Sequence, residues 1–355
     1  MIDMAHKIGK QTFVIDRRVM LRAGACIVGP LEKEGPLGDY FDQKAEEDFG
    51  EDTWEKGEAR FVEATYGKLM AQLNMEASLV DCILSGDLLN QCTASACGLK
   101  QSGRPFVGLF GACSTMAESL LVGSLLVDGG GMNHVVCMTS SNFCSSEKQF
   151  RFPLELGGQR PPTSQWTVTG SGAVLLSAEG QGPVVTSVTP GIIEDYEIAD
   201  ANNMGAAMAP SAASTIIAHL ADTGREASFY DLIVTGDLGI TGSGLLREIL
   251  QMHGHNVFDE TRKGALPAPI PEHCGFFHQD CGALIFDPLT QGTASGGSGC
   301  GCSAVVLTGY IMKLMQQKIL NKVLFVATGA LMSPVSVKQG DPILGVAHAI
   351  ALENC

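Results

Sequence analysis

The chain contains two approximate copies of one strand–turn–helix unit. Residues 76–88 and 226–238 are identical at eight of thirteen positions, and most of the differences exchange one apolar residue for another, as in a buried strand. A second pair of segments begins at Gly111 and Gly299, each with a small-residue turn followed by an apolar helix. The first of these turns carries Cys113, and the second has Gly301 at the equivalent place. The repeats therefore predict a duplicated α/β fold with a thiol in one half.

The predicted elements keep the same order in both halves. Strands that alternate with helices imply sheets covered on both faces, and each central helix is too apolar to face water. We divide the chain into an N-terminal half, 1–185, which carries Cys113, and a C-terminal half, 186–355. The two pairs of copies lie 150 and 188 positions apart, which predicts an inserted loop region within 251–298. The expected strands are 19–29, 80–84, 106–110, 135–139, 172–177, 232–235, 323–327 and 345–352, and the expected helices 58–74, 211–220 and those following Cys113 and Cys302.

Composition excludes several classes of protein. The 355 residues are 45% hydrophobic and carry a formal charge of −15, without a basic stripe for nucleic acid or a polybasic membrane anchor. We expect a soluble protein without a signal peptide or transmembrane helix, since the apolar window 106–127 contains a polar turn and an acid. The 12 cysteines are scattered and their spacing matches no common zinc motif, so neither a disulfide framework nor a metal site is expected.

Cys113 is the first candidate for chemistry. A thiol at a helix N-terminus meets unpaired N–H groups and the positive end of the helix dipole, which favour a nucleophilic thiolate. The same N–H groups, those of Ser114 and Thr115, could instead hold a carboxylate. A third interpretation is a small buried residue at a tight turn, although Gly301 indicates that the turn itself needs no thiol.

Several longer motifs carry a resemblance to a known family. The runs G-D-L-L-N-Q (86–91), G-A-C-S-T (111–115) and T-V-T-G-S-G-A-V (167–174) lie in the first half, and G-G-S-G-C-G-C-S-A-V-V (296–306) and A-T-G-A-L-M-S-P (327–334) in the second. Together they resemble the stage V sporulation protein AD family of spore-forming bacteria, a branch of the thiolase and ketoacyl-synthase fold. The resemblance spans essentially the whole chain. It implies a thiolase-like fold, in which two duplicated β/α halves form a five-layer α-β-α-β-α sandwich.

The resemblance also implies a function. The family binds dipicolinic acid (pyridine-2,6-dicarboxylate), free or as its calcium chelate, for uptake into the developing spore and release in germination. It works with membrane-embedded proteins of the same sporulation operon, which implies a peripheral location at the spore inner membrane. Thiolase folds pair through an edge strand, so we expect a homodimer. We expect no resident cofactor, and calcium would arrive with the ligand, where Asp87 or Asp128 offers oxygen donors.

The remaining candidates surround Cys113 in the predicted fold. Asp87 and Asn90 follow the first repeat strand, at the sheet edge where α/β proteins place ligands, although Asp237 echoes Asp87 and suggests that both acids cap turns. Polar groups after the next strand could bind carboxylate oxygens and a pyridine nitrogen, and cations on the following segment could pair with a dianion or be ordinary surface charges. These residues are Ser140, Ser141, Asn142, Lys148, Arg151 and Arg160.

The resemblance to thiolases permits a test of catalysis. Laying the repeat on the thiolase Gly-His-Pro motif places Gly297-Ser298-Gly299 there, so the histidine base is replaced by Ser298. Condensing enzymes also place a histidine on the inserted loop, which makes His278 a candidate for lining the pocket. We therefore expect a non-catalytic binding protein. Two alternatives stay open: an acyltransferase with Cys113 as nucleophile and His278 as base, and a ligand-free scaffold for membrane channel proteins.

Overall fold

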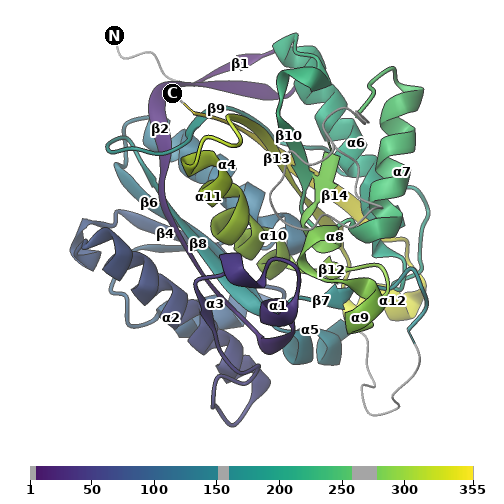
Figure 1. Cartoon of the computed structure of the whole chain (residues 1–355), viewed down its shortest axis with the longest axis horizontal. Helices are drawn as coiled ribbons and strands as arrows, with labels where there is room; N and C mark the ends of the chain where they lie inside the picture. The colour runs from purple at the N-terminus through teal and green to yellow at the C-terminus, as the bar shows by residue number, and fades with distance from the viewer. Residues whose placement is uncertain (1–4, 151–159, 258–277, 355) are drawn as a thin grey trace.

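The computed structural model describes residues 5–150, 160–257 and 278–354, and its strands form two halves of equal design. The strand order is β11-β10-β13-β14-β9-β2-β8-β6-β4-β5, with β1 and β3 beside β2. The halves meet where β2 pairs antiparallel with β9, so β5, β4, β6, β8 and β2 of the first half correspond to β11, β10, β13, β14 and β9 of the second (Figure 1).

The first half contains β1 (His6–Ile8), β2 (Thr12–Val28), α1 (Pro30–Glu34), β3 (Gln43–Lys44), α2 (Trp54–Leu73), β4 (Cys82–Gly86), α3 (Thr93–Leu99), β5 (Phe106–Gly108), α4 (Thr115–Asp128), β6 (His134–Ser141), α5 (Phe143–Phe150), β7 (Trp166–Thr167) and β8 (Gly170–Ser177). The second contains β9 (Val184–Thr189), α6 (Met204–Thr223), β10 (Leu232–Thr235), α7 (Gly239–Met252), β11 (His278–Asp280), α8 (Cys281–Ile285), α9 (Pro288–Gln291), β12 (Gly297–Ser298), α10 (Cys300–Val306), α11 (Met312–Gln316), β13 (Lys322–Leu331), α12 (Pro334–Gln339) and β14 (Leu344–Glu353). A π-helical turn, Leu307–Ile311, joins α10 to α11.

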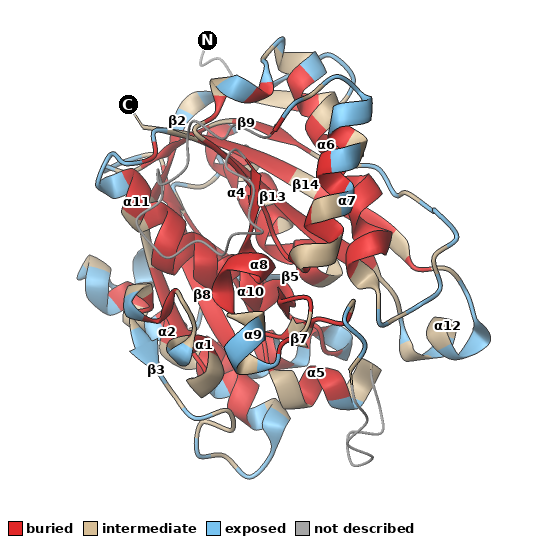
Figure 2. Cartoon of the chain, turned by 45° about the vertical axis from the view of Figure 1, so that its right-hand side comes forward, coloured by how far each residue is buried: buried red, intermediate tan, exposed pale blue. Residues whose placement is uncertain are grey.

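The layers follow from the alternation of side chains along each strand. In β6, Val135 and Cys137 point into one core with α4 and α10, whereas Val136 and Met138 point into another with α2. In the second half, Phe325 of β13 faces the central core, and its neighbour Leu324 packs against α6 and α7. The strands of the two halves form one continuous sheet, and we call its first-half part (β5, β4, β6, β8 and β2) the first sheet and its second-half part (β11, β10, β13, β14 and β9) the second sheet. The five layers are α2 and α3, the first sheet, α4 with α10 and α11, the second sheet, and α6 and α7. Figure 2 shows the middle-layer helix α10 buried along its length.

The repeat extends to the outer helices, beyond the segments that revealed it. Helices α2 and α6 each have 20 residues, and each ends at a left-handed C-cap, Asn74 in one and Gly224 in the other. These caps are 150 positions apart, as are the repeat strands β4 and β10. Equivalent residues of the halves can therefore be compared directly.

The strand predicted at 106–110 is shorter in the structure and lies at an edge of the sheet: β5 spans Phe106–Gly108, and all three residues are exposed. The boundary at residue 185 falls inside β9 and stays a prediction, because the halves share one core. Part of the inserted region, 258–277, lies outside the described residues.

Helix α6 tests the expectation of a soluble protein. Within the described part of the chain, it is the one helix long and apolar enough to cross a membrane, but 72% of that stretch is buried. Such burial fits the core helix of a soluble protein. The apolar window 106–127, in contrast, is mostly the middle-layer helix α4.

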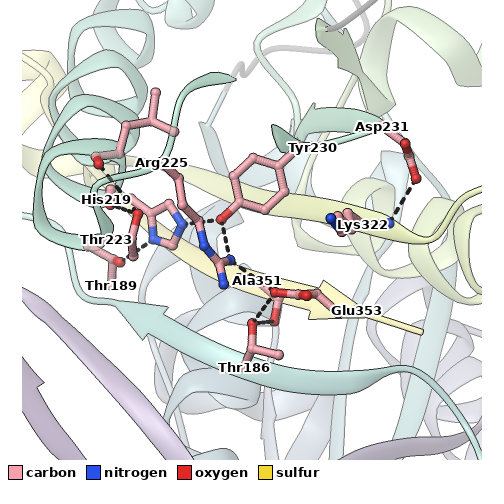
Figure 3. A network of polar contacts seen from close by, with 11 residues as sticks. Thr186, Thr189, His219, Thr223, Arg225, Tyr230, Asp231, Lys322, Ala351 and Glu353 are labelled. Carbon is pink, nitrogen blue, oxygen red and sulfur yellow. Dashed lines mark hydrogen bonds and ion pairs between the residues drawn. The ribbon is translucent and has the colours of Figure 1, made fainter. Parts of the chain in front are cut away.

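A polar network connects the end of α6 to β9 and to the end of β14 (Figure 3). The buried His219 lies 2.8 Å from Thr189 Oγ1 through Nδ1 and 2.5 Å from the Tyr230 hydroxyl through Nε2. Arg225 donates to the same hydroxyl and pairs with Glu353 Oε1 at 3.0 Å. Burial lowers the pKa of His219 to about 3, so this imidazole is neutral in the folded protein.

Candidate functional site

A cavity of about 350 Å³ lies beside the turn that carries Cys113. Its wall is mostly apolar and comes from both halves, with contributions from α5, β12, the end of β13 and α12. Among the described residues of the wall there is one acid, and there is no histidine, lysine or arginine. The wall consists of Leu88, Phe110, Ala112, Cys113, Ser146, Glu147, Phe150, Thr167, Met204, Ser298, Gly299, Ala330, Leu331, Met332, Ser333 and Ser336.

The turn before α4 is held by its own polar groups and by the second half. Ser114 Oγ donates to Gly111 O at 2.7 Å, and Thr115 Oγ1 donates to Ala112 O at 2.6 Å. From the other half, β13 packs directly on the turn, since a Cβ at Gly329 would lie 2.4 Å from Gly111 O. This close approach places Cys113 at the boundary between the halves.

The backbone N–H groups of Ser114 and Thr115, which we expected to face a ligand, already donate within the turn. The amide of Ser114 donates to Gly111 O at 3.1 Å, and that of Thr115 donates to Ala112 O. Both amides thus have partners within the turn, and their binding of a ligand carboxylate stays a prediction. A short 3-10 turn over Ala112–Ser114 precedes α4, and its closed hydrogen bonds use the donors that a plain helix start would leave unpaired.

Asp237 is the residue beside Cys113 that our candidate set lacked. It follows β10, and its two carboxylate oxygens accept from Thr328 Oγ1 at 2.8 Å and from the Gly299 amide at 3.0 Å. The charge of this carboxylate also acts on the Cys113 thiol. The repeat could have pointed to Asp237, because it occupies the position equivalent to Asp87, but the sequence suggested that both acids cap turns.

Electrostatics keep the thiol protonated. Burial raises the pKa of Cys113 well above its ordinary value, and the negative charge of Asp237 raises it further. Burial likewise raises the pKa of Asp237 to about 7. The helix N-terminus thus does not produce a thiolate here, because desolvation and a neighbouring acid outweigh it.

The one acid on the described wall forms an ion pair with a cation that lies behind the wall. Glu147 pairs with Arg160 at 2.9 Å, between Oε2 and Nη2, and its Oε1 accepts from Thr167 Oγ1 at 3.1 Å. The Arg160 guanidinium also lies over the rings of Trp166, at 4.8 Å, and Phe143, at 5.3 Å. Arg160 is therefore close to the cavity but reaches it only through Glu147, whereas Arg151 lies outside the described residues.

The polar groups that follow β6 lie behind the wall. Ser140 Oγ donates to the buried carboxylate of Glu58 at 2.9 Å, and Ser141 Oγ donates to Val168 O at 2.6 Å. Asn142 donates its side-chain amide to Glu47 O at 2.7 Å and caps α5. None of these three is on the cavity wall, so the structure does not bring them to Cys113 as we expected.

Asp87, Asn90 and Lys148 also lie away from the cavity. The Asp87 carboxylate accepts from the amides of Leu89 and Ser95, at 2.9 and 2.8 Å, and so caps the chain that leads into α3. Asn90 and Lys148 line a separate shallow groove on the other side of α5, where Lys148 pairs with Glu55 at 2.9 Å.

Two further candidates are far from Cys113 or turned into the core. Asp128 ends α4, roughly 20 Å along the helix axis from Cys113, and accepts from the amides of Ala5 and Arg17. His278 is buried in β11, where Thr235 Oγ1 and Arg247 Nε lie 2.9 and 3.3 Å from its two ring nitrogens. The expectation that His278 lines the pocket is not met among the wall residues.

The described part of the chain shows neither a metal cluster nor a disulfide. No group of three or more His, Cys, Asp or Glu among these residues is arranged to hold a metal ion. The cysteines from Cys26 to Cys302 that the structure describes are free thiols, and most are buried.

With this geometry established, comparison with known proteins places the chain. The family model of Stage V sporulation protein AD (SpoVAD) matches residues 9–353. The chain belongs to this family. It is 40% identical over 347 residues to Stage V sporulation protein AD of Bacillus subtilis (strain 168), covering 98% of this chain and 97% of that protein.

Solved structures show that the chain has the thiolase-like fold. Human mitochondrial 3-ketoacyl-CoA thiolase in complex with CoA matches with a TM-score of 0.55 at 11% identity, over 96% of this chain and 99% of that one. The 3-oxoacyl-[acyl-carrier-protein] synthase III of Aquifex aeolicus VF5 matches with a TM-score of 0.52 at 10% identity, over 95% and 99% of the two chains. At such identities the likeness concerns the fold alone, and activity has to be argued from the site.

Proposed function

We propose that this SpoVAD-family protein binds dipicolinic acid in the cavity beside Cys113 without transforming it, for uptake into the spore and release in germination. One observation carries the proposal: the cavity borders the cysteine at the nucleophile position, yet its described wall has no histidine, lysine or arginine, and burial and the charge of Asp237 raise the pKa of the thiol. Acyl transfer through a cysteine needs a group that removes the thiol proton. Ser298, which the repeat in the sequence aligns with the thiolase histidine, lies on the described wall and supports this proposal.

The cavity suits a small aromatic ligand in size and surface. A ring with two carboxylates has about 12 non-hydrogen atoms, and ligands of that size reach micromolar affinity at ordinary efficiency per atom. Leu88, Phe110 and Phe150 offer apolar surface for such a ring, and hydroxyls such as those of Ser298 and Ser333 offer donors for its carboxylates.

Arg160 supplies the positive charge that a dianion needs. In the structure the guanidinium of Arg160 forms an ion pair with Glu147. We propose that a ligand carboxylate takes the place of Glu147, because Arg160 is already oriented by Trp166 and can bind a carboxylate bidentately. If the ligand enters as its calcium chelate, the carboxylate of Glu147 can instead meet the calcium ion, since Asp87 and Asp128 are both engaged elsewhere.

Calorimetric titration with dipicolinate, with and without calcium, tests the proposal. We expect saturable binding that Cys113→Ala weakens, while Cys300→Ala does not, because Cys300 packs beside Cys113 but is not on the wall. Arg160→Gln should weaken binding of the free acid by about tenfold or more, and Glu147→Gln should strengthen it. If Glu147 meets the calcium, Glu147→Gln weakens binding of the chelate only. No heat with the wild-type protein would contradict the proposal.

The two alternatives predict different results. An acyltransferase would form a thioester on Cys113, which mass spectrometry would detect after exposure to acyl thioesters. A ligand-free scaffold would show neither heat nor acylation and would only bind membrane partners. The raised pKa of Cys113 speaks against the first, and the presence of a formed cavity speaks against the second.

We also propose a homodimer formed through β5, and peripheral attachment to the spore inner membrane through membrane proteins of the same operon. The edge position of β5 and the exposure of Phe106 and Val107, at 39% and 46%, support pairing with a second copy. Val107→Lys should then give a monomer in sedimentation analysis, whereas Leu245→Lys, a change at an exposed residue of α7, should not. An unchanged mass for Val107→Lys would contradict the pairing.

A further inference from the structure

Helices α5 and α12 are equivalent parts of the cavity wall. Helix α5 follows β6 in the connection to β8, and α12 follows β13 in the connection to β14. Because β6 and β8 correspond to β13 and β14, the two helices leave equivalent ends of the two halves. Helix α5 supplies Ser146, Glu147 and Phe150 to the wall, and α12 with its cap supplies Ser333 and Ser336. The attachment of the two helices to the protein can therefore be compared directly.

Helix α5 is fastened to its neighbours. Ser145 Oγ donates to the Glu58 carboxylate of α2 at 2.6 Å, and Gln149 Nε2 donates to Leu88 O, in the loop after β4, at 3.2 Å. Glu147 adds a contact with β7, whose threonine hydroxyl it accepts at 3.1 Å. Three residues of α5 are buried. This side of the cavity is therefore a fixed wall, since its movement would break buried hydrogen bonds.

Helix α12 lacks such attachments. In the part of the chain that the structure describes, every hydrogen bond of residues 333–341 joins two members of this segment. Ser333 and Ser336 cap the start of the helix reciprocally, and the amide of Gly340 closes its end on Val337 O at 3.1 Å. None of the helical residues is buried, as Figure 2 shows. The segment thus satisfies its own polar groups and packs little against the rest of the protein.

We propose that residues 333–341 form a gate over the cavity, and that a small ligand enters and leaves when this segment moves. A segment whose hydrogen bonds are internal can move as a unit without exposing unpaired backbone groups. The chain is held again just beyond it, where the Ile343 amide donates to Ile198 O at 2.7 Å. Gly340 lies between the helix and this anchor in a left-handed conformation, with a φ of +78°, which makes it the hinge.

The gate rests on the proposed function only for the identity of the ligand. Opening exposes the cavity and Cys113, which is 6% exposed in the closed structure. Access to the thiol therefore reports on the gate without a ligand. With a ligand, the gate controls the rates of entry and release, because both steps pass through the open form.

The first test is the rate of Cys113 alkylation by iodoacetamide at constant pH, followed by mass spectrometry of the Cys113 peptide in the full-length protein. Gly340→Ala disfavours the left-handed hinge of the closed form, so we expect alkylation to be about fivefold faster or more. Gly224→Ala is the matched control, because it introduces the same strain at the C-cap of α6. An added Cβ has open space at both positions, so both variants should fold.

The second test is stopped-flow binding of dipicolinate to the same proteins. Gly340→Ala should raise the association and dissociation rates by similar factors and leave Kd within about twofold, because the strain favours opening of the free and the bound protein alike. A weaker Kd at an unchanged association rate would overturn the inference, since it would show damage to the wall. So would an alkylation rate that is unchanged in Gly340→Ala or equally raised in Gly224→Ala. If dipicolinate does not bind, alkylation still decides the gate, so the two proposals fail separately.

Discussion

Asp87 and Asp237 hold the same place in the two halves, after β4 and β10, and both are fully buried. The first accepts backbone amides at the start of its own helix region, whereas the second accepts from a hydroxyl and a loop amide, and its charge raises the pKa of the Cys113 thiol. The comparison indicates that duplication placed an aspartate at the same position in both halves, and that the neighbouring residues determine what each one binds. The candidate site beside Cys113 lies where the two halves differ in these neighbours.

The turns that carry Cys113 and Gly301 also differ in their surroundings. A Cβ at Gly301 would lie 2.5 Å from Ser141 Oγ and 2.7 Å from Gly170 O, whereas the Cys113 side chain borders a cavity. The second half therefore cannot carry a thiol at the equivalent position. Four predictions test how far the two halves are interchangeable.

The largest effect is expected at the central turn. Gly301→Cys should lower the free energy of unfolding by about 3 kcal/mol, because the new side chain meets backbone that cannot move aside. The reciprocal change, Cys113→Gly, should cost about 1 kcal/mol, since it only enlarges an existing cavity. Chemical denaturation measures both. Equal losses would show that the turns are sterically alike.

The second prediction concerns His219, whose first-half equivalent is Leu69; both are fully buried. The folded-state pKa of about 3 lies below the ordinary value of 6.5, so the unfolded chain binds the extra proton. The contribution of the neutral imidazole is complete above pH 6.5 and is lost as the pH falls towards 3, by about 1 kcal/mol per pH unit. Unfolding of His219→Gln should show a flatter acid limb, and the exposed His253→Gln should match the wild type.

The third prediction concerns Glu58, whose second-half equivalent is Met208. Burial, and then the charge of Asp87, raise the pKa of Glu58 from 4.5 to about 8. The folded state therefore holds a proton that the unfolded state has lost, and stability falls as the pH rises from about 4.5 to 8, by about 1 kcal/mol per pH unit or less. Glu58→Gln should flatten this alkaline limb. A slope no different from that of Glu63→Gln, an exposed acid of the same helix, would show that Glu58 is already ionised.

The smallest effect is a gain. Gly67 lies inside α2 with nothing within 4 Å of an added Cβ, and its equivalent in α6 is Ile217. Gly67→Ala should raise the free energy of unfolding by about 0.5–1 kcal/mol, because alanine restricts the unfolded chain and fits the helix. The melting temperature measures it. A loss would indicate a contact on this face of α2, such as one with another subunit.

The sequence by itself determined the duplicated α/β design, the positions of β10, α4 and the outer helices, and the place of Cys113 at the turn before α4. These follow from local information: apolar periodicity, turn residues and two segments that repeat. Its family resemblance also predicted the thiolase-like fold, which the comparisons confirm.

Only the tertiary structure decided what surrounds Cys113. In the structure Asp128 lies at the far end of α4, and His278 is buried in the core. The amides of Ser114 and Thr115 donate within their own turn, and Arg160 forms an ion pair with Glu147. The structure also places Asp237 where its charge acts on the Cys113 thiol. The sequence contains both Asp237 and Asp280, but which acid caps α7 depends on how β10 and β11 align, and strand register is a property of packing between distant segments rather than of local sequence.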